Sequence, residues 1–187
     1  MINKHLQIMR FNFPEIEEVN SFIISCKSSR KTLIIDVGGF DSRMDEYIEI
    51  NNLDVESLFI THAHYDHIGK IESVISRYPD IQVFSDDSRG KSIKDGDVFT
   101  LGFVSGIFHR IPGHTDDMAV VYLDGHLFTG DSLFAGSVGG TSNEKNYSTQ
   151  IREIKTKLMT YPGDTIIQHG HGPDSTIELG KTVNPFL

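Results

Sequence analysis

The first third of the chain alternates short apolar, β-branched runs with turn residues, and this alternation predicts β-strands. The four expected strands cover residues 5–13, 21–26, 32–36 and 57–60. Ahead of the fourth strand, Met44 and Ile48 recur at helical spacing. Asp41 or Ser42 can cap the helix that this spacing predicts.

The fourth strand leads directly into a cluster of histidines, and a helix is expected behind it. Ile68, Ile71 and Ile75 recur at helical spacing, and the pattern stops at Pro79. The helix is therefore expected to begin just behind His67. The histidine cluster is then expected on the loop between strand and helix.

The rest of the chain predicts a second β-rich region. Its expected strands cover residues 81–85, 97–101, 103–110, 118–123, 126–129 and 165–168. Asp124-Gly125 between two of them is typical of a hairpin turn. Residues 136–146 are mostly Gly, Ser, Thr and Asn, which predicts a surface loop long enough to border a site.

Two helices complete the expected elements. Ile154 and Leu158 mark an amphipathic helix, and Ser175 or Thr176 opens a short last one. Strands and helices thus alternate twice, without a Pro- or Ser-rich linker and without a tandem repeat. This order fits one α/β domain over residues 1–187, with a two-sheet core and helices outside.

The acidic composition argues against several partners. The chain carries 17 Lys and Arg against 26 Asp and Glu, a net charge of −9, and no basic run. Nucleic acids and anionic membranes normally require a basic surface, so neither is expected to bind. A signal peptide's long apolar core is missing from the first residues, which favours a cytoplasmic location. Cys26 is the single cysteine, which excludes an intrachain disulfide and a thiolate metal cluster.

The sequence THAHYDHIG holds the densest group of potential ligands. His62, His64, Asp66 and His67 carry the imidazole and carboxylate donors that Zn²⁺ and similar ions prefer. His62 and His64 are placed to share one metal. Asp66 and His67 would face a second position. Catalytic zinc takes about three protein ligands and leaves a position for water, so further ligands must come from elsewhere.

Three further ligand-type residues follow candidate strands in glycine-containing loops: His114 in PGHT, Asp131 in TGDSLF and His171 in HGHGP. Their spacing leaves open how they pair with the two metals. Asp36, at a strand end, either accepts a hydrogen bond from a ligand histidine or caps a turn. The role of His169 is also open.

The order HxHxDH, GHT, GD and GHGP resembles the metallo-β-lactamase-fold hydrolase superfamily over almost the whole chain. From residue 130 onward, GDSLFAGSVGG and HGHGPDSTIELGKTVNPFL are most similar to small bacterial type II glyoxalase-like (hydroxyacylglutathione hydrolase-like) proteins. The resemblance implies a four-layer αββα sandwich with a dinuclear metal site at one edge. It assigns His62, His64 and His114 to the first metal, Asp66, His67 and His171 to the second, and Asp131 to both.

The chain departs from full-length hydroxyacylglutathione hydrolases in two features. Those enzymes continue into a helical C-terminal extension that helps to grip glutathione, whereas this chain stops at Leu187. The Arg-Thr-Asp that many relatives carry is replaced by Gly-Thr-Ser at residues 140–142. Lys145 and Tyr147 are the nearby candidates for substrate contact.

The expected reaction is metal-dependent hydrolysis of a small-molecule thioester of the S-2-hydroxyacylglutathione type. Two divalent ions, zinc first with iron or manganese as alternatives, would lower the pKa of a bridging water from about 15.7 toward neutrality. The resulting hydroxide would attack the acyl carbon, and Asp66 would take the proton.

Other functions stay open beside this one. A mononuclear iron persulfide dioxygenase shares the ligands of the superfamily, but that group carries an Arg-Thr-Asp-type segment that this chain lacks. A lactonase or another ester hydrolase of the superfamily would use the same metal chemistry. A non-enzymatic scaffold usually shows decayed ligands, whereas all seven are present here.

Overall fold

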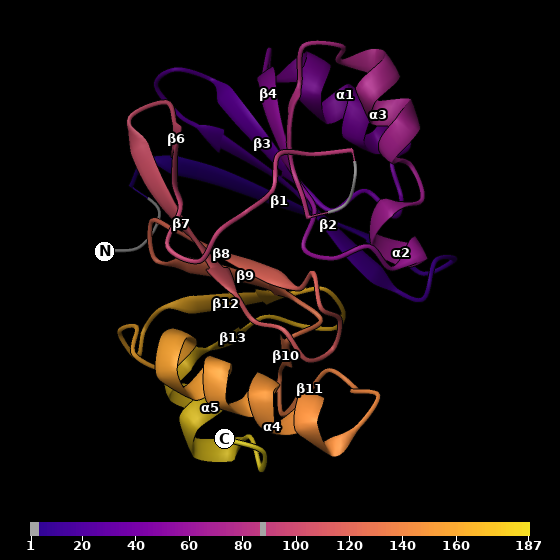
Figure 1. The fold of residues 1–187 in the computed structure, drawn as a ribbon. Helices are drawn as coiled ribbons and strands as arrows, with labels where there is room; N and C mark the ends of the chain where they lie inside the picture. Colours follow the sequence, from indigo (N-terminus) through magenta and orange to yellow (C-terminus); the bar gives the residue numbers. More distant parts are fainter. Residues whose placement is uncertain (1–3, 87–88) are drawn as a thin grey trace.

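Two β-sheets packed face to face form the centre of the molecule, and helices cover both outer faces (Figure 1). This computed structural model describes residues 4–86 and 89–187. The four layers confirm the expected αββα sandwich.

The first sheet comes from the first half of the chain. In spatial order its strands are β1 (Leu6–Phe13), β2 (Val19–Cys26), β3 (Lys31–Ile35), β4 (Asp54–Phe59) and β5 (Gln82–Phe84). β1, β2 and β3 pair antiparallel, whereas β3, β4 and β5 run parallel. Parallel neighbours need crossover connections. Helices supply them: α1 (Ser42–Ile50), and then α2 (Tyr65–Ile68) with α3 (Ile71–Arg77).

The second sheet comes from the rest of the chain and has the spatial order β13-β12-β9-β8-β7-β6. Its strands are β6 (Val98–Leu101), β7 (Val104–Arg110), β8 (Ala119–Leu123), β9 (His126–Gly130), β12 (Ile166–His169) and β13 (Ser175–Thr176). A separate small hairpin consists of β10 (Leu133–Phe134) and β11 (Ser137–Val138). The outer face is covered by α4 (Glu144–Glu153), the π-helical turn η1 (Ile154–Leu158) and α5 (Ile177–Val183).

The alternation of side chains along the strands explains the layers. In β2, Ile24 joins the apolar cluster between the sheets, while its neighbour Ile23 joins the cluster beneath the helices α1 and α3. Leu33 and Ile34 divide in the same way in β3. A third cluster, which includes Leu158, lies beneath α4 and α5. Each fully buried Leu or Ile contributes about 1.5–3 kcal/mol, so burial on both faces holds these strands in place.

Local sequence signals set several element ends as expected. Asp124 and Gly125 have φ of 46° and 86°, which the two-residue turn between β8 and β9 requires. Asp41 and Thr176 accept backbone N–H bonds as the caps of α1 and α5.

The helix expected behind His67 is present as α3, which ends before Pro79, but its expected start just behind His67 and its continuity are wrong. α2 begins at Tyr65, ahead of His67, and ends at Ile68. Val37 causes the break, because its N–H donates to the His67 carbonyl at 2.8 Å and its own carbonyl accepts from Lys70 N at 2.7 Å. The crossing chain thus takes the His67 carbonyl that a continuous helix would use.

The loop expected over residues 136–146 is only partly irregular. It contains β11, and α4 begins inside it because the Asn143 side chain accepts from Asn146 N at 2.9 Å. The loop does border the histidine cluster, since the Gly140 carbonyl accepts from Nδ1 of His114 at 2.7 Å.

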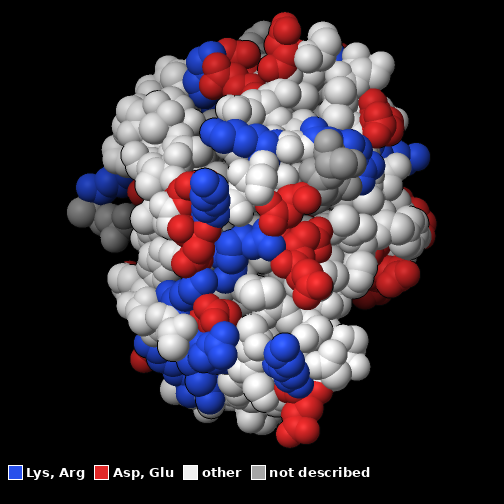
Figure 2. Space-filling view, viewed as in Figure 1, with Lys and Arg blue, Asp and Glu red and all other residues white. Residues whose placement is uncertain are grey.

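The surface carries interleaved charges. On the face in Figure 2, Lys and Arg lie among Asp and Glu. Lys157, for example, contacts Asp95 at 2.8 Å and Glu153 at 3.0 Å. Within residues 4–86 and 89–187, no helix has the length and apolar content needed to cross a membrane. The expected lack of binding to nucleic acid and membranes stays a prediction.

β9 begins at a buried histidine. His126 is 2% exposed, and neither ring nitrogen has a hydrogen-bond partner among the residues that the structure describes. Burial lowers its pKa below the usual 6.5, although Asp124 and Asp174 act in the opposite direction. The folded protein therefore holds a neutral imidazole that the unfolded chain protonates in mild acid.

We expect His126→Leu to stabilise the protein, and by more at about pH 5 than at about pH 8. As the pH falls below about 6.5, the unfolded chain takes up a proton that the folded protein resists, so the wild type loses up to about 1.4 kcal/mol per pH unit. Urea unfolding of both proteins at the two pH values measures the difference. An equal gain at both would contradict the assigned cause.

Candidate metal centre

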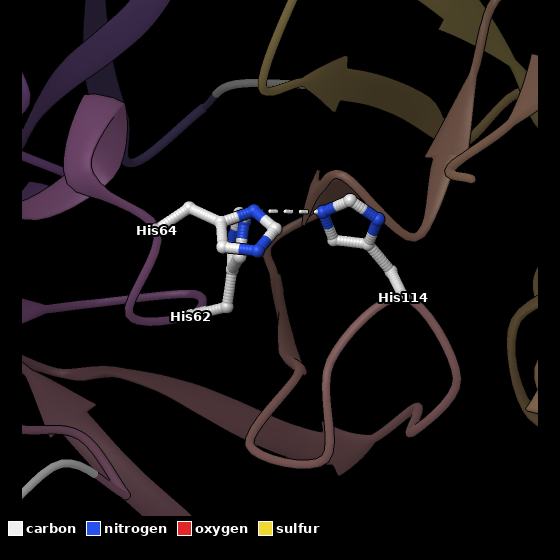
Figure 3. A group of neighbouring side chains, drawn as sticks. All are labelled: His62, His64 and His114. Atoms are coloured by element: carbon white, nitrogen blue, oxygen red, sulfur yellow. Dashed lines mark hydrogen bonds between the residues drawn. The ribbon is translucent and has the colours of Figure 1, made fainter. Parts of the chain in front are cut away.

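The seven candidate ligands lie together at one end of the sandwich, each behind a strand. β4 leads into His62, His64 and the short helix α2, which carries Asp66 and His67. The other three follow strands of the second sheet: His114 follows β7, Asp131 follows β9 and His171 follows β12. Figure 3 shows His62 and His64 facing His114 across the space between two loops.

The ligand atoms form two groups. The first group is His62, His64 and His114, and the second group is Asp66, His67, Asp131 and His171; within each, the ligand atoms lie within 4.8 Å of one another. Asp131 lies between the groups, with Oδ2 3.6 Å from His114 Nε2 and Oδ1 3.3 Å from His67 Nε2. Six residues are grouped as the resemblance implied, while Asp131, assigned there to both metals, falls in the second group and approaches the first; metal binding by all seven stays a prediction.

Hydrogen bonds fix which nitrogen faces the site in three of the five candidate histidines. Nδ1 donates to Asp36 Oδ2 at 2.7 Å in His67, to Glu17 O at 2.9 Å in His171 and to Gly140 O in His114. The Nε2 atoms of these three histidines are therefore the nitrogens that face the site. Such a bond on the far nitrogen is the usual support of a metal-binding histidine.

The donors of both groups fit cations. In the first group, His64 Nδ1 lies 3.0 Å from His62 Nε2 and 3.0 Å from His114 Nε2, so three ring nitrogens converge on one point. In the second group, His67 Nε2 and Asp131 Oδ1 are buried and make no hydrogen bond. Buried polar atoms without hydrogen bonds are costly, and two cations held by the converging nitrogen and oxygen atoms would satisfy both groups.

The titration of the buried residues agrees with this fit. Burial lowers the pKa of His62 to about 2, and neighbouring His67 acts in the same direction. Burial also opposes a charge on His67, but Asp36 and Asp131 outweigh it and raise the pKa of His67 to about 10. Burial works against ionised Asp131, yet His67 lowers the pKa of Asp131 to about 2. His62 is thus neutral and keeps a free lone pair. His67 is protonated, and a bound cation would replace that proton.

Asp36 orients candidate ligands of both groups through hydrogen bonds. Its Oδ1 accepts from Thr61 N and its Oδ2 from the Thr61 hydroxyl, each at 2.8 Å, besides the bond from His67. The Thr61 hydroxyl in turn lies 3.1 Å from His62 Nδ1. Asp36 also adopts a φ of 54°, which is uncommon for a residue other than glycine. Of its two alternative roles, the structure shows the hydrogen bond to a candidate ligand.

Asn20 is a supporting residue that sequence reasoning missed. From β2 of the first sheet, its Nδ2 donates to His169 O at 3.1 Å and to Gly172 O at 3.0 Å, on both sides of His171. Its backbone N–H donates to Gly170 O at 2.8 Å. The available signal was an asparagine inside a strand, where this residue type is depleted.

His169 belongs to neither ligand group. It is fully buried, with Nδ1 donating to Leu133 O at 2.5 Å and Nε2 accepting from the Ser175 hydroxyl at 2.7 Å. Burial lowers its pKa to about 4. Both nitrogens are thus occupied by protein groups, and the residue ties β12 to β10 and β13.

Lys145 and Tyr147 lie on the first turns of α4, close in sequence to the loop that contacts His114. Both side chains are exposed, and neither belongs to a ligand group. Their contact with a substrate stays a prediction.

Comparisons with known proteins agree with the family that the sequence motifs resemble. The sequence pattern of the Metallo-beta-lactamase superfamily matches residues 16–86. The chain is 30% identical to the probable metallo-hydrolase YqgX of Bacillus subtilis, over 86% of this chain and 89% of YqgX. It is 29% identical to the hydroxyacylglutathione hydrolase GloC of Haemophilus influenzae, over 92% of this chain and 97% of GloC.

Among solved structures, the BLEG-1 B3 metallo-beta-lactamase shares the fold, with a TM-score of 0.85 at 23% identity over 97% of this chain and 99% of that one. The layered fold and the two adjacent ligand groups define a metallo-hydrolase class of protein. The chain belongs to the metallo-beta-lactamase superfamily.

We expect Asp36→Asn to lower the free energy of unfolding by about 3 kcal/mol, because it removes the charge partner of buried His67. Whichever way the amide turns, its NH₂ faces one of the N–H or O–H donors that the carboxylate accepts. Asp54→Asn is the matched control, since the exposed Lys31–Asp54 ion pair contributes under about 1 kcal/mol. Urea unfolding measures both, and equal losses would contradict the role of Asp36.

Proposed function

We propose that this protein is a metal-dependent hydrolase of thioesters of the S-2-hydroxyacylglutathione type. The observation that carries the proposal is the pair of ligand groups that meet at Asp131. The similarity to GloC, named a hydroxyacylglutathione hydrolase, supports the substrate class.

Seven residues would hold two divalent ions, zinc first, with iron or manganese as alternatives. His62 Nε2, His64 Nδ1 and His114 Nε2 would hold the first ion; Asp66, His67 and His171 would hold the second, with one oxygen of Asp131 directed at each. When bound, the ions supply Lewis-acid chemistry, which lowers the pKa of water and stabilises developing negative charge on the acyl oxygen.

The protein's own groups orient this chemistry and move the proton. Asp66 is 7% exposed, and its Oδ2 lies 3.1 Å from His171 Nε2, so a carboxylate oxygen faces the other donors of the second group. We assign Asp66 as the acceptor of the proton that the attacking water loses. Asp36 binds Nδ1 of His67 so that Nε2 faces the site, and Glu17 O does the same for His171.

The substrate would approach from the exposed side of the first group. His64 and Tyr65 are exposed, whereas Asp66 and His67 behind them are buried. Lys145 and Tyr147 on α4 are the proposed contacts for the thiol carrier. A small-molecule thioester fits a site that is open on one side.

The test is thiol release from S-lactoylglutathione by protein whose bound metals are quantified in the same sample. We expect turnover that tracks two metals per chain and disappears with a chelator. His62→Ala and Asp131→Ala should each lower turnover by more than about 100-fold, because even supporting residues of metal sites cost about 10–100-fold. His5→Ala, which removes an exposed imidazole outside both groups, is the matched control.

Undiminished turnover by the metal-free protein would overturn the proposal. Silence with both metals bound would reject the glutathione thioester and favour another thioester or a lactone. A single bound iron with oxygen uptake from a glutathione persulfide would instead favour the dioxygenase.

A further inference from the structure

The segment that carries His114 also forms a hydrogen bond with the loop that carries the other two candidate ligands of the first group. Asp117, three residues after His114, accepts a hydrogen bond at Oδ2 from the backbone N–H of Ala63, at 2.8 Å. Ala63 stands between His62 and His64. One short segment, which follows β7 of the second sheet, thus carries one ligand of the first group and contacts the backbone between the other two.

The loop around Ala63 needs such support. Residues 60–64 form no helix or strand, and Ala63 and His64 are exposed. The preceding residue, Thr61, is held because its carbonyl accepts from Ala119 N at 2.8 Å and its side chain contacts Asp36. Beyond Thr61, the hydrogen bond to Asp117 ties the backbone between the two histidines to the loop before β8.

Arg110 holds the segment that carries Asp117. From the end of β7, its guanidinium donates to Asp117 O at 3.1 Å and to Asp116 O at 2.6 Å, and it forms an ion pair with Asp86. The backbone that carries the Asp117 carboxylate is therefore held in place. A fixed acceptor can define where Ala63 N–H, and the histidines beside it, must lie.

The second group has separate supports. Asp66 and His67 lie on α2 and are buried, His67 donates to Asp36, and Asn20 and Glu17 hold the loop of His171. None of these contacts passes through Asp117. A change at Asp117 should therefore act on the first group and spare the second.

We propose that Asp117 is a positioning residue for the first metal: by accepting the Ala63 N–H, it sets His62 and His64 at the distance from His114 that one cation requires. This inference rests on the proposed function, because it assumes that the first group binds a metal. The hydrogen bond carries the effect, so a neutral acceptor of the same shape preserves it.

The test measures Zn²⁺ affinity by isothermal titration calorimetry in two single-site backgrounds. His171→Ala leaves the first group intact, and His114→Ala leaves the second. In the His171→Ala background, Asp117→Ala should weaken Zn²⁺ binding about 10–100-fold, as loss of a supporting residue does in other metal sites. In the His114→Ala background, it should change affinity by less than about threefold, since independent sites add.

Two matched variants separate position from charge. Asp117→Asn keeps an oxygen for the Ala63 N–H and should stay within about threefold of its parent, because the hydrogen bond survives. Asp116→Ala removes the same charge from an exposed neighbour whose side chain makes no described contact, and it should behave like its parent. Equal weakening by Asp117→Asn and Asp117→Ala would show a charge effect and overturn the proposal.

Four further outcomes are decisive. Equal weakening in both backgrounds, or a metal-free Asp117→Ala protein that has lost its circular dichroism spectrum, would show a general structural role and reject positioning. If Asp117→Ala binds two zinc ions with wild-type affinity, the positioning role of Asp117 is rejected and the proposed function is unaffected. A wild-type protein that binds no Zn²⁺ in either group would reject the proposed function instead.

Discussion

Each ligand group takes side chains from both sheets, so the packing between the sheets sets the distances inside the group. His62 and His64 follow β4 of the first sheet, whereas His114 follows β7 of the second. Beneath them, apolar side chains meet, such as Phe59 and Phe108 with ring centroids 5.0 Å apart. Protein interiors are close-packed and resist compression. The irregular loops at the edge therefore inherit a fixed separation from a rigid interface.

Polar contacts at the edge add orientation to that separation. A buried carboxylate is costly unless donors surround it, and Asp36 meets this condition with bonds from Thr61 and His67. Removing either charge of such a buried pair is more harmful than the pair is stabilising. The network around Asp36 is thus better understood as an arrangement that fixes the orientation of the histidine rings than as a source of stability.

The sequence predicts what lies close together along the chain. The ligands of THAHYDHIG stand within a few positions of one another, and the strands follow from alternating apolar residues. The roles of Asn20 and Asp117 were not predicted because their contacts join residues 149 and 54 positions apart. The break between α2 and α3 was not predicted because it depends on hydrogen bonds to Val37, which is distant in the sequence. Glu17 acts through a backbone oxygen, so no residue type could have indicated it.

The hydrogen bond from His171 to the Glu17 carbonyl spans 154 positions of the chain. Closing so long a loop is entropically expensive, and contacts of this separation slow folding. During synthesis, the β1–β2 hairpin leaves the ribosome long before its partner loop exists. The histidines after β4 are synthesised directly behind the strand that positions them. The second ligand group, in contrast, cannot form until the last part of the chain has been made. The site therefore matures only when the beginning and the end of the polypeptide meet.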